Sequence, residues 1–386
     1  MEIYRMKEKS LSHREPSGRQ FNTDCEGPIS KNDNAHELTE YFIPEGDKFF
    51  SLISRYDDFL AYIAKKEGYK AGNTLGLILP FLKAYGATNK KIEEYSVKNI
   101  LLVPGAMETL HYISNKMPSF VISTSYEPYI YALCDRVGFP KEMVYCTTLD
   151  IDRYRLSRQE KERVRRFCDE IKTLPMIDES ANNKERNDDV LSSKESSLRD
   201  KSVKKSIKRL DEIFWDEILD MKCSKMIKET NPIGGEEKAM AILDSLRRTG
   251  NEPCDVMYVG DSITDREAFT LVRKEGGLTL SFNGNRYAIE EAEIATISDH
   301  TIIISIIAEA FYEGGREGVL EIVKNWGYSA IEQGIKDKLL FKRFLSVYPK
   351  NLPIVEWVTD LNRNHLVKES EDFRKGFRGE KVGGLG

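Results

Sequence analysis

The sequence predicts an α/β fold in which a parallel sheet carries helices on both faces. Short apolar runs that are typical of buried parallel strands alternate with helical segments, and they occur at 119–123, 144–148, 256–259 and 278–282. Polar and acidic residues follow several of these runs directly, at the edge where a parallel sheet binds its ligands. With 386 residues, the chain is long enough for two or three folding units.

Helical patterns fill the segments between these strands. Apolar residues at 3.6-residue spacing, with glycine or proline at the ends, predict helices over 104–113, 127–137, 236–248 and 265–274. The same pattern predicts a small helical unit over 29–98, with helices at 47–63, 73–84 and 89–97.

Two further regions interrupt or extend the alternation. We interpret residues 151–229 as a helical insertion shaped as a hairpin, with a disordered tip near 178–202 because this stretch has few large apolar residues. Residues 313–386 are predicted to form a helical C-terminal extension with a flexible end, and its helices are expected at 318–326, 339–347 and 355–364. Residues 1–18 are predicted to be a flexible tail.

Composition argues against several functional classes. Lys and Arg number 58 and Asp and Glu 63, and the net charge of -5 gives no strong attraction to nucleic acid. No apolar run approaches the roughly 20 residues of a membrane span, and no signal peptide is recognisable. Six scattered cysteines without a CxxC pair favour a cytoplasmic protein without disulfides or a zinc site. A bound metal would therefore be held by carboxylates, which suits Mg2+.

The strongest chemical signal is the segment YVGDSITDREAF. Asp261 follows the apolar strand 256–259, and Asp265 comes four residues later at the start of a predicted helix. Two carboxylates at the carboxyl edge of a parallel sheet can hold a divalent cation. The alternative is that both residues only turn the chain and cap the helix.

A second signal is the acid pair Asp24 and Glu26 in the segment NTDCEGP. In an extended segment, side chains two residues apart point to the same side. One carboxylate can then attack phosphorus while the other manages the proton of the leaving group. Because little apolar sequence precedes Asp24, a chance acidic loop is the alternative.

Hydroxyl groups and a lysine supply the third and fourth signals. Ser123, Thr124 and Ser125 stand between an apolar strand and a helix, where hydroxyls and backbone N–H groups can bind an anion or simply cap the helix. Lys238 lies near the start of a predicted helix, from which an ammonium group could reach a phosphoryl oxygen. A lone lysine is more often exposed to solvent.

The order of these four signals resembles that of the haloacid dehalogenase-like (HAD) superfamily of phosphotransferases. Within it, the chain is similar to the phosphoserine phosphatase branch over 19–30, 99–150 and 230–312, on the segments LLVPGAMETLHYIS, SFVISTSYEPYI, GGEEKAMAILDSL and VMYVGDSITDREAFTLVRKEGGLTLSFNGN. The resemblance implies a Rossmann-like core from 19–28, 99–150 and 230–312, with residues 29–98 as a helical cap.

The resemblance also implies roles for individual residues. Asp24 would be a nucleophile that forms an aspartyl-phosphate, and Glu26 a general acid and base. Ser123 would bind the phosphoryl group and Lys238 would neutralise its charge. Mg2+ would be held by Asp24, the backbone carbonyl of Glu26 and Asp261, with support from Asp265. Further candidates for substrate binding are Thr124, Ser125 and Asn283, and candidates near the mouth of the site are Asn32, Asp33, Arg55, Tyr56 and Tyr126.

The sequence departs from the family pattern at three points. Glu26 replaces the usual Asp, Pro28 replaces a hydroxyl residue, and the strand before Asp24 is polar. This DCEGP version is similar to an uncharacterised archaeal HAD-like family that includes the R subunit of energy-converting hydrogenase A. Two hypotheses follow. The first is a Mg2+-dependent phosphatase acting on a small phosphorylated metabolite. The second is a weakly active or inactive accessory subunit that binds a protein partner through the insertion or the C-terminal helices.

Overall fold

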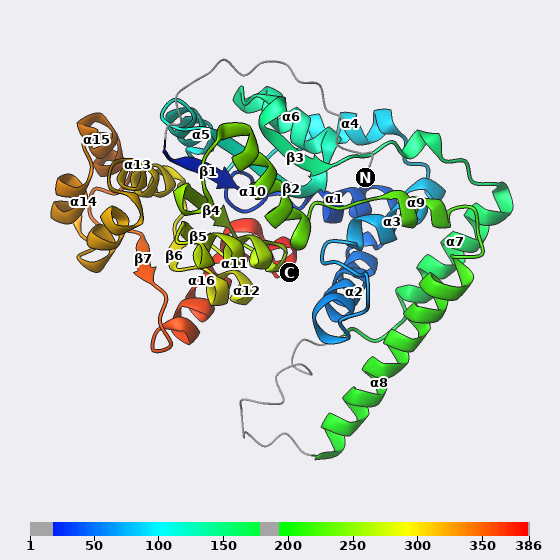
Figure 1. Ribbon diagram of the computed structural model, residues 1–386. Coiled ribbons are helices and arrows are strands. Elements are labelled where there is room, and N and C mark those ends of the chain that lie inside the picture. The colour runs from blue at the N-terminus through cyan, green and yellow to red at the C-terminus, as the bar shows by residue number, and fades with distance from the viewer. Residues whose placement is uncertain (1–17, 178–192, 385–386) are drawn as a thin grey trace.

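The computed structural model describes residues 18–177 and 193–384 and is built around a central sheet (Figure 1). Within these residues the sheet has seven strands in the order β3-β2-β1-β4-β5-β6-β7. Neighbouring strands are parallel except for β7, which is antiparallel to β6. The bounds are Gln20–Thr23 (β1), Ser119–Tyr126 (β2), Val144–Thr147 (β3), Val256–Gly260 (β4), Leu278–Phe282 (β5), Ile294–Ile297 (β6) and Ile354–Trp357 (β7). The predicted Rossmann-like α/β fold is confirmed.

Helices cover both faces of this sheet. One face packs against α5 (Ala106–Ser114), α6 (Glu127–Val137) and α13 (Ile302–Lys324). The other face packs against α10 (Glu236–Thr249), α11 (Arg266–Lys274) and α12 (Arg286–Glu291). Successive side chains of a strand point to opposite faces, so Phe120 and Ile122 enter the second core while Val121 enters the first. Burial on both faces explains why these strands are continuous apolar runs in the sequence.

The polar character of β1 has a local explanation. Gln20 and Asn22 share one face of the strand and are buried against α10. The Gln20 amide donates hydrogen bonds to Ser245 Oγ at 2.7 Å and to Asn22 Oδ1 at 3.0 Å, and the Asn22 amide donates to Ser245 Oγ at 3.2 Å. Thr249 donates to Gln20 Oε1 at 2.7 Å. Because each buried amide has a partner, a polar strand is tolerated in the centre of the sheet.

The two helical insertions share one hydrophobic core, which lies beside the sheet (Figure 1). The first contributes α1 (Asn34–Phe42), α2 (Gly46–Asp58), α3 (Thr74–Ala84) and α4 (Asn89–Lys98), and the second contributes α7 (Arg158–Ile171), α8 (Ser193–Asp211) and α9 (Ser224–Glu229). Phe81 packs edge-on against Phe214 with ring centroids 6.0 Å apart. Tyr56 donates a hydrogen bond to Asp211 Oδ1 at 2.5 Å and accepts one from Trp215 at 2.8 Å. We call these seven helices the composite cap.

Part of the predicted disorder falls within α8. This helix begins at Ser193, so residues 193–202 are helical, whereas we expected a disordered tip near 178–202. Residues 178–192 of that tip and residues 1–17 of the predicted tail lie outside the described residues.

The C-terminal extension contains a strand that the sequence prediction missed. The helix predicted at 355–364 is wrong, because β7 occupies Ile354–Trp357 and α16 (Arg363–Arg378) begins only after a turn. Val355 is buried while Glu356 is exposed, which is the two-residue period of a strand. Pairing with β6 supplies the backbone hydrogen bonds that a helix would otherwise make. The sheet therefore extends beyond residue 312, the predicted end of the core.

The other C-terminal helices pack beside or across the sheet. Helix α13 runs through the boundary predicted at 312, and α14 (Tyr328–Gly334) and α15 (Lys338–Val347) pack against it. The chain ends in α16 and a short helix α17 (Glu380–Gly383), drawn in red near the centre of Figure 1. Among the helices of residues 18–177 and 193–384, none has both the length and the apolarity required to cross a membrane.

Candidate active site

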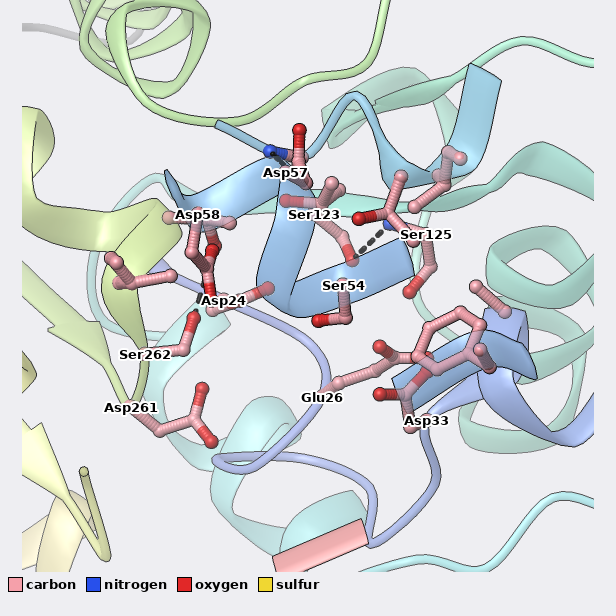
Figure 2. Close-up of a pocket in the computed structure, with 18 of the residues that line it drawn as sticks. Asp24, Glu26, Asp33, Ser54, Asp57, Asp58, Ser123, Ser125, Asp261 and Ser262 are labelled. Atoms are coloured by element: carbon pink, nitrogen blue, oxygen red, sulfur yellow. Dashed lines mark hydrogen bonds between the residues drawn. The ribbon is translucent and has the colours of Figure 1, made fainter. Parts of the chain in front are cut away.

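The residues singled out in the sequence meet at the carboxyl edge of the sheet. Strand β1 lies between β2 and β4, so Asp24, Ser123 and Asp261 emerge at the same edge. The backbone N–H of Asp24 continues the ladder by donating to Val259 O at 2.8 Å. These residues line a pocket of about 120 Å³, whose opposite wall comes from the composite cap (Figure 2).

Asp24 is almost fully buried and has two hydrogen-bond donors. Lys238 Nζ lies 2.5 Å from Asp24 Oδ2, and the backbone N–H of Cys25 donates to Oδ1 at 2.6 Å. Burial raises the pKa of Asp24 to about 7, although the ammonium of Lys238 acts in the opposite direction. The carboxyl group is thus held in place beside a permanent positive charge.

Lys238 is the positive charge at the base of the site. It lies in the first turn of α10, is completely buried, and contacts Asp265 Oδ1 at 2.7 Å as well as Asp24. Burial alone would lower the pKa of Lys238, but the two carboxylates outweigh that effect and raise it. The expectation that a lone lysine is exposed does not hold here, because two buried acids compensate its charge.

Asp265 organises the turn between β4 and α11. Its Oδ2 accepts hydrogen bonds from the backbone N–H groups of Asp261 and Ser262, both at 3.0 Å, and its Oδ1 accepts one from Tyr258 at 2.7 Å. Its side chain thus forms a capping box with Ser262 in the turn before α11, but it makes no side-chain cap hydrogen bond to α11 itself. Asp265 also pairs with Lys238, so it links the turn to Asp24.

The carboxylates form a donor set suited to a hard divalent cation. One oxygen each from Asp24, Asp261 and Asp265 lies within 4.8 Å of the others. Gly27 has a φ of +97°, and a Cβ on it would lie 2.2 Å from Asp261 Oδ2, so the backbone after Glu26 packs directly against this carboxylate. Oxygen ligands of this kind fit Mg2+. Asp265 accepts hydrogen bonds on both oxygens and does not line the pocket, whereas Asp24 and Asp261 do, so these two are the better placed carboxylates.

Asp261 also carries two arginines that the sequence analysis did not identify. Arg374 and Arg378, from α16, both form ion pairs with Asp261 Oδ2, and the Arg378 pair measures 3.0 Å. Their spacing of four residues places both on one face of a helix, which is the signal that could have found them. Their partner Asp261 lies 113 residues before Arg374 in the sequence, so the spacing of the two arginines did not indicate that they are buried in the site.

Glu26 faces the pocket from the loop after β1. Its Oε1 accepts a hydrogen bond at 2.7 Å from the backbone N–H of Asn34, at the start of α1. Burial and the nearby Asp33 raise the pKa of Glu26 well above its usual range, and the Asn34 N–H and the Ser125 hydroxyl oppose the rise. In Figure 2 the carboxylates of Glu26 and Asp33 lie together on the side of the pocket away from Asp261.

The three hydroxyl residues lie within β2 rather than in a helix cap. Strand β2 continues to Tyr126, and α6 has no side-chain cap. Ser123 Oγ accepts a hydrogen bond from the Ser125 N–H at 3.2 Å, and both residues line the pocket (Figure 2). Thr124 also lines it, but its hydroxyl donates to Ile233 O at 2.9 Å and so holds the segment before α10.

Most of the remaining candidates lie outside the pocket. The Asn283 amide donates to Ser298 O at 2.7 Å and accepts from Ser298 N at 2.8 Å, so this side chain fixes a turn. Tyr126 donates to Leu75 O at 2.6 Å, and Arg55 donates to Ile177 O at 2.9 Å. Of the five residues proposed near the mouth (Asn32, Asp33, Arg55, Tyr56 and Tyr126), Asp33 is the one that lines the described pocket.

The composite cap contributes pocket residues that the sequence analysis missed. Phe50, Ser54, Asp57 and Asp58 all line the pocket and belong to α2. Ser54 follows Phe50 by four residues, and Asp57 and Asp58 follow Ser54 by three and four, so the set lies on one face of the helix. This helical spacing was the sequence pattern that could have identified them. Asp57 is buried and accepts hydrogen bonds from Tyr69 at 2.6 Å and from the Gly72 N–H at 2.9 Å, and burial raises its pKa to about 6.

Comparison with known proteins places this architecture among solved structures. No protein-family model matches the chain, and no curated protein matches it. The chain is similar to the structure of gene product AF1437 from Archaeoglobus fulgidus, with 26% sequence identity and a TM-score of 0.75. The similarity covers 96% of this chain and 99% of that one. The composite cap and the C-terminal segment therefore belong to an architecture that the two proteins share along with the sheet.

Proposed function

We propose that the protein is a Mg2+-dependent phosphomonoester hydrolase that acts through an aspartyl-phosphate on a small phosphorylated metabolite. The observation that carries this proposal is the convergence of Asp24, Asp261 and Ser123 in one pocket at the carboxyl edge of the sheet, with Lys238 buried directly behind Asp24. A carboxylate beside a buried ammonium, with serine hydroxyl groups lining the same pocket, is suited to a dianionic phosphoryl group. The small pocket volume favours a small substrate.

In the proposed mechanism Asp24 is the nucleophile. A carboxylate oxygen of Asp24 attacks phosphorus, the ester P–O bond breaks, and the departing oxygen takes a proton from Glu26. Water then attacks the phosphorus of the aspartyl-phosphate while Glu26 accepts its proton, which releases inorganic phosphate and restores Asp24. Lys238 compensates negative charge throughout, and the hydroxyl groups of Ser123 and Ser125 hydrogen-bond the phosphoryl oxygens.

The carboxylates of Asp24 and Asp261 would hold the divalent cation. Its chemistry is to neutralise charge on the transferred phosphoryl group and to fix its orientation. Asp265 acts indirectly, since it orients the Asp261 backbone and the Lys238 ammonium. The composite cap would exclude water from the pocket. Ser54 of α2 and Asp33, the N-cap residue of α1, line the side where the leaving group would lie.

A second candidate function is an accessory subunit that retains the fold without turnover. The observation that favours it is the pairing of Asp261 with Arg374 and Arg378, because this pairing already compensates the charge of a proposed metal ligand. In this case the long helices α7 and α8, which extend away from the sheet in Figure 1, would offer the docking surface for a protein partner. The two candidates differ in whether Asp24 performs chemistry.

A phosphatase screen distinguishes them. Full-length protein is assayed with Mg2+ against a panel of small phosphomonoesters, and wild type is compared with Asp24→Asn and with Asp360→Asn as a matched exposed control. Loss of a nucleophile lowers kcat by at least about a thousandfold, whereas the control retains wild-type activity. Equal and negligible rates for wild type and Asp24→Asn would remove the enzyme proposal and leave the accessory role.

A further inference from the structure

The C-terminal segment 363–383, which we call the C-terminal strap, joins the sheet to the composite cap. At its beginning, Leu366 and Val367 pack against Ile289 and Ala295 of the core. Slightly further along, Ser370 Oγ donates a hydrogen bond to Gly284 O at 2.6 Å. These contacts anchor the first half of α16 to the region of α12 and β6.

The other end of the strap contacts the cap side. Lys381 forms ion pairs with Glu40 at 2.5 Å and with Asp47 at 3.2 Å, on α1 and α2. The ammonium of Lys31 lies 3.8 Å from the ring centroid of Phe377. The pairs of Lys381 are exposed and therefore individually weak, so this end is held less firmly than the beginning.

Between these ends the strap inserts two arginines into the acidic site. The side chains of Arg374 and Arg378 are each only 4% exposed, and both guanidinium groups converge on one oxygen, Asp261 Oδ2. Arg374 also donates to Asn283 O at 3.3 Å. Arg378 donates to Lys31 O at 3.0 Å and to Asn32 O. Their hydrogen bonds thus go to Asp261 and to backbone carbonyls on both sides of the site.

We propose that the C-terminal strap is an internal latch in which Arg374 and Arg378 compete with a divalent cation for Asp261. The inference rests on the cation site proposed above. A divalent ion on Asp261 would lie within a few ångströms of two buried guanidinium groups, and like charges at that distance repel strongly in a protein interior. Cation binding therefore weakens both arginine pairs, and because Arg378 also binds the loop at Lys31 and Asn32, it loosens the strap from the cap side.

Mg2+ affinity tests the competition directly. The dissociation constant is measured by titration calorimetry for wild type, the double variant R374Q/R378Q and the control R363Q, which makes the same change in the same helix at an exposed pair with Asp360. The latch requires at least a tenfold tighter Mg2+ affinity in R374Q/R378Q and an unchanged affinity in R363Q. Equal or weaker affinity in the double variant overturns it.

Amide hydrogen exchange tests whether Mg2+ loosens the C-terminal strap, and it needs no substitution. Amides of residues 374–383 in wild-type protein should exchange faster at saturating Mg2+ than in EDTA, while those of α10 do not. Mg2+ binding with unchanged or slower exchange at 374–383 overturns the latch. Neither readout needs turnover. If R374Q/R378Q binds Mg2+ with wild-type affinity while the wild type hydrolyses phosphomonoesters, the latch is wrong and the proposed function stands. If R374Q/R378Q binds Mg2+ more tightly but the wild type has no phosphatase activity, the latch stands and the proposed function is wrong.

Discussion

Replacement of Lys238 by methionine probes the charge balance at the base of the site. Methionine has a similar length and can fill the same space, so the main change is the loss of the ammonium between Asp24 and Asp265. Asp265 keeps Tyr258 and two backbone N–H groups as donors, but Asp24 keeps only the Cys25 N–H. The cost of the substitution therefore falls mainly on Asp24.

The expected magnitude follows from the burial of the group. Lys238 has no exposed surface, and removal of one partner from a buried ion pair destabilises a protein by about 3–5 kcal/mol. Adding Asp24→Asn to Lys238→Met should recover about 1–3 kcal/mol, because it removes the carboxylate that has lost its counter-charge. The exposed control Lys90→Met should cost under about 0.5 kcal/mol.

The loss should also depend on pH. The pKa of Asp24 is about 7 in the folded chain, above its usual 3.8, so the contribution of this carboxyl to stability is present below about 3.8 and is lost as the pH rises through about 7. Without Lys238 the folded pKa rises further. Ionised Asp24 then carries a larger penalty at pH 8, whereas at pH 5 it can stay protonated. The destabilisation by Lys238→Met is therefore larger at pH 8.

Urea unfolding in EDTA, followed by far-UV circular dichroism at pH 5 and pH 8, measures both effects. A loss below about 1 kcal/mol at pH 8 contradicts the assignment of Lys238 as a buried counter-charge. A loss at pH 5 that equals or exceeds the loss at pH 8 contradicts the role of Asp24. If adding Asp24→Asn to Lys238→Met recovers no stability, the role of Asp24 is contradicted as well.

Three further substitutions test other parts of the site and cap. Glu26→Asp withdraws the carboxyl group from the Asn34 N–H by about one methylene, and kcat should fall by about a hundredfold. A gain would show that Glu26 is a handicap. Gly27→Ala places a side chain at a positive φ and against Asp261, so the free energy of unfolding should fall by about 2–4 kcal/mol and Mg2+ binding should weaken. The control Gly68→Ala also has a positive φ but meets open space, so it should leave Mg2+ binding unchanged. Tyr56→Phe removes two hydrogen bonds to partly buried partners and should cost about 1–3 kcal/mol in urea unfolding, whereas the same change at the exposed Tyr41 should cost little. Equal costs at both positions would exclude a shared cap core.

The parallel part of the sheet could be predicted because its strands carry local signals. Strand β5 has the predicted bounds, and β4 differs by one residue, since apolar runs between helices mark buried parallel strands. Strand β7 could not be predicted from the same pattern. Of its four residues Val355 alone is buried, and its conformation depends on pairing with β6, which is a tertiary effect.

In the site, too, the residues with a local sequence signal could be predicted, whereas those placed by contacts distant in sequence could not. Ser123 and Asp261 were found because each ends or follows an apolar run, and Asp24 because it forms an acid pair with Glu26. Strand order brings the three together. Asn283 also follows a strand, but its left-handed backbone turns the amide toward Ser298 instead of the pocket. Arg374 gave no local signal of burial, since an arginine in an amphipathic helix is normally exposed.

The shared core of the composite cap has a consequence for folding during synthesis. Tyr56 and Asp211, which meet in that core, are 155 residues apart in sequence. At a synthesis rate of about 5–20 residues per second, roughly 8–30 s separate their emergence from the ribosome. Throughout that interval the apolar faces of α2 and α3 lack the partners that later bury them. The growing chain therefore carries an exposed apolar surface for longer than a domain with a contiguous cap would, and early chaperone contact with residues 49–84 is the expected result.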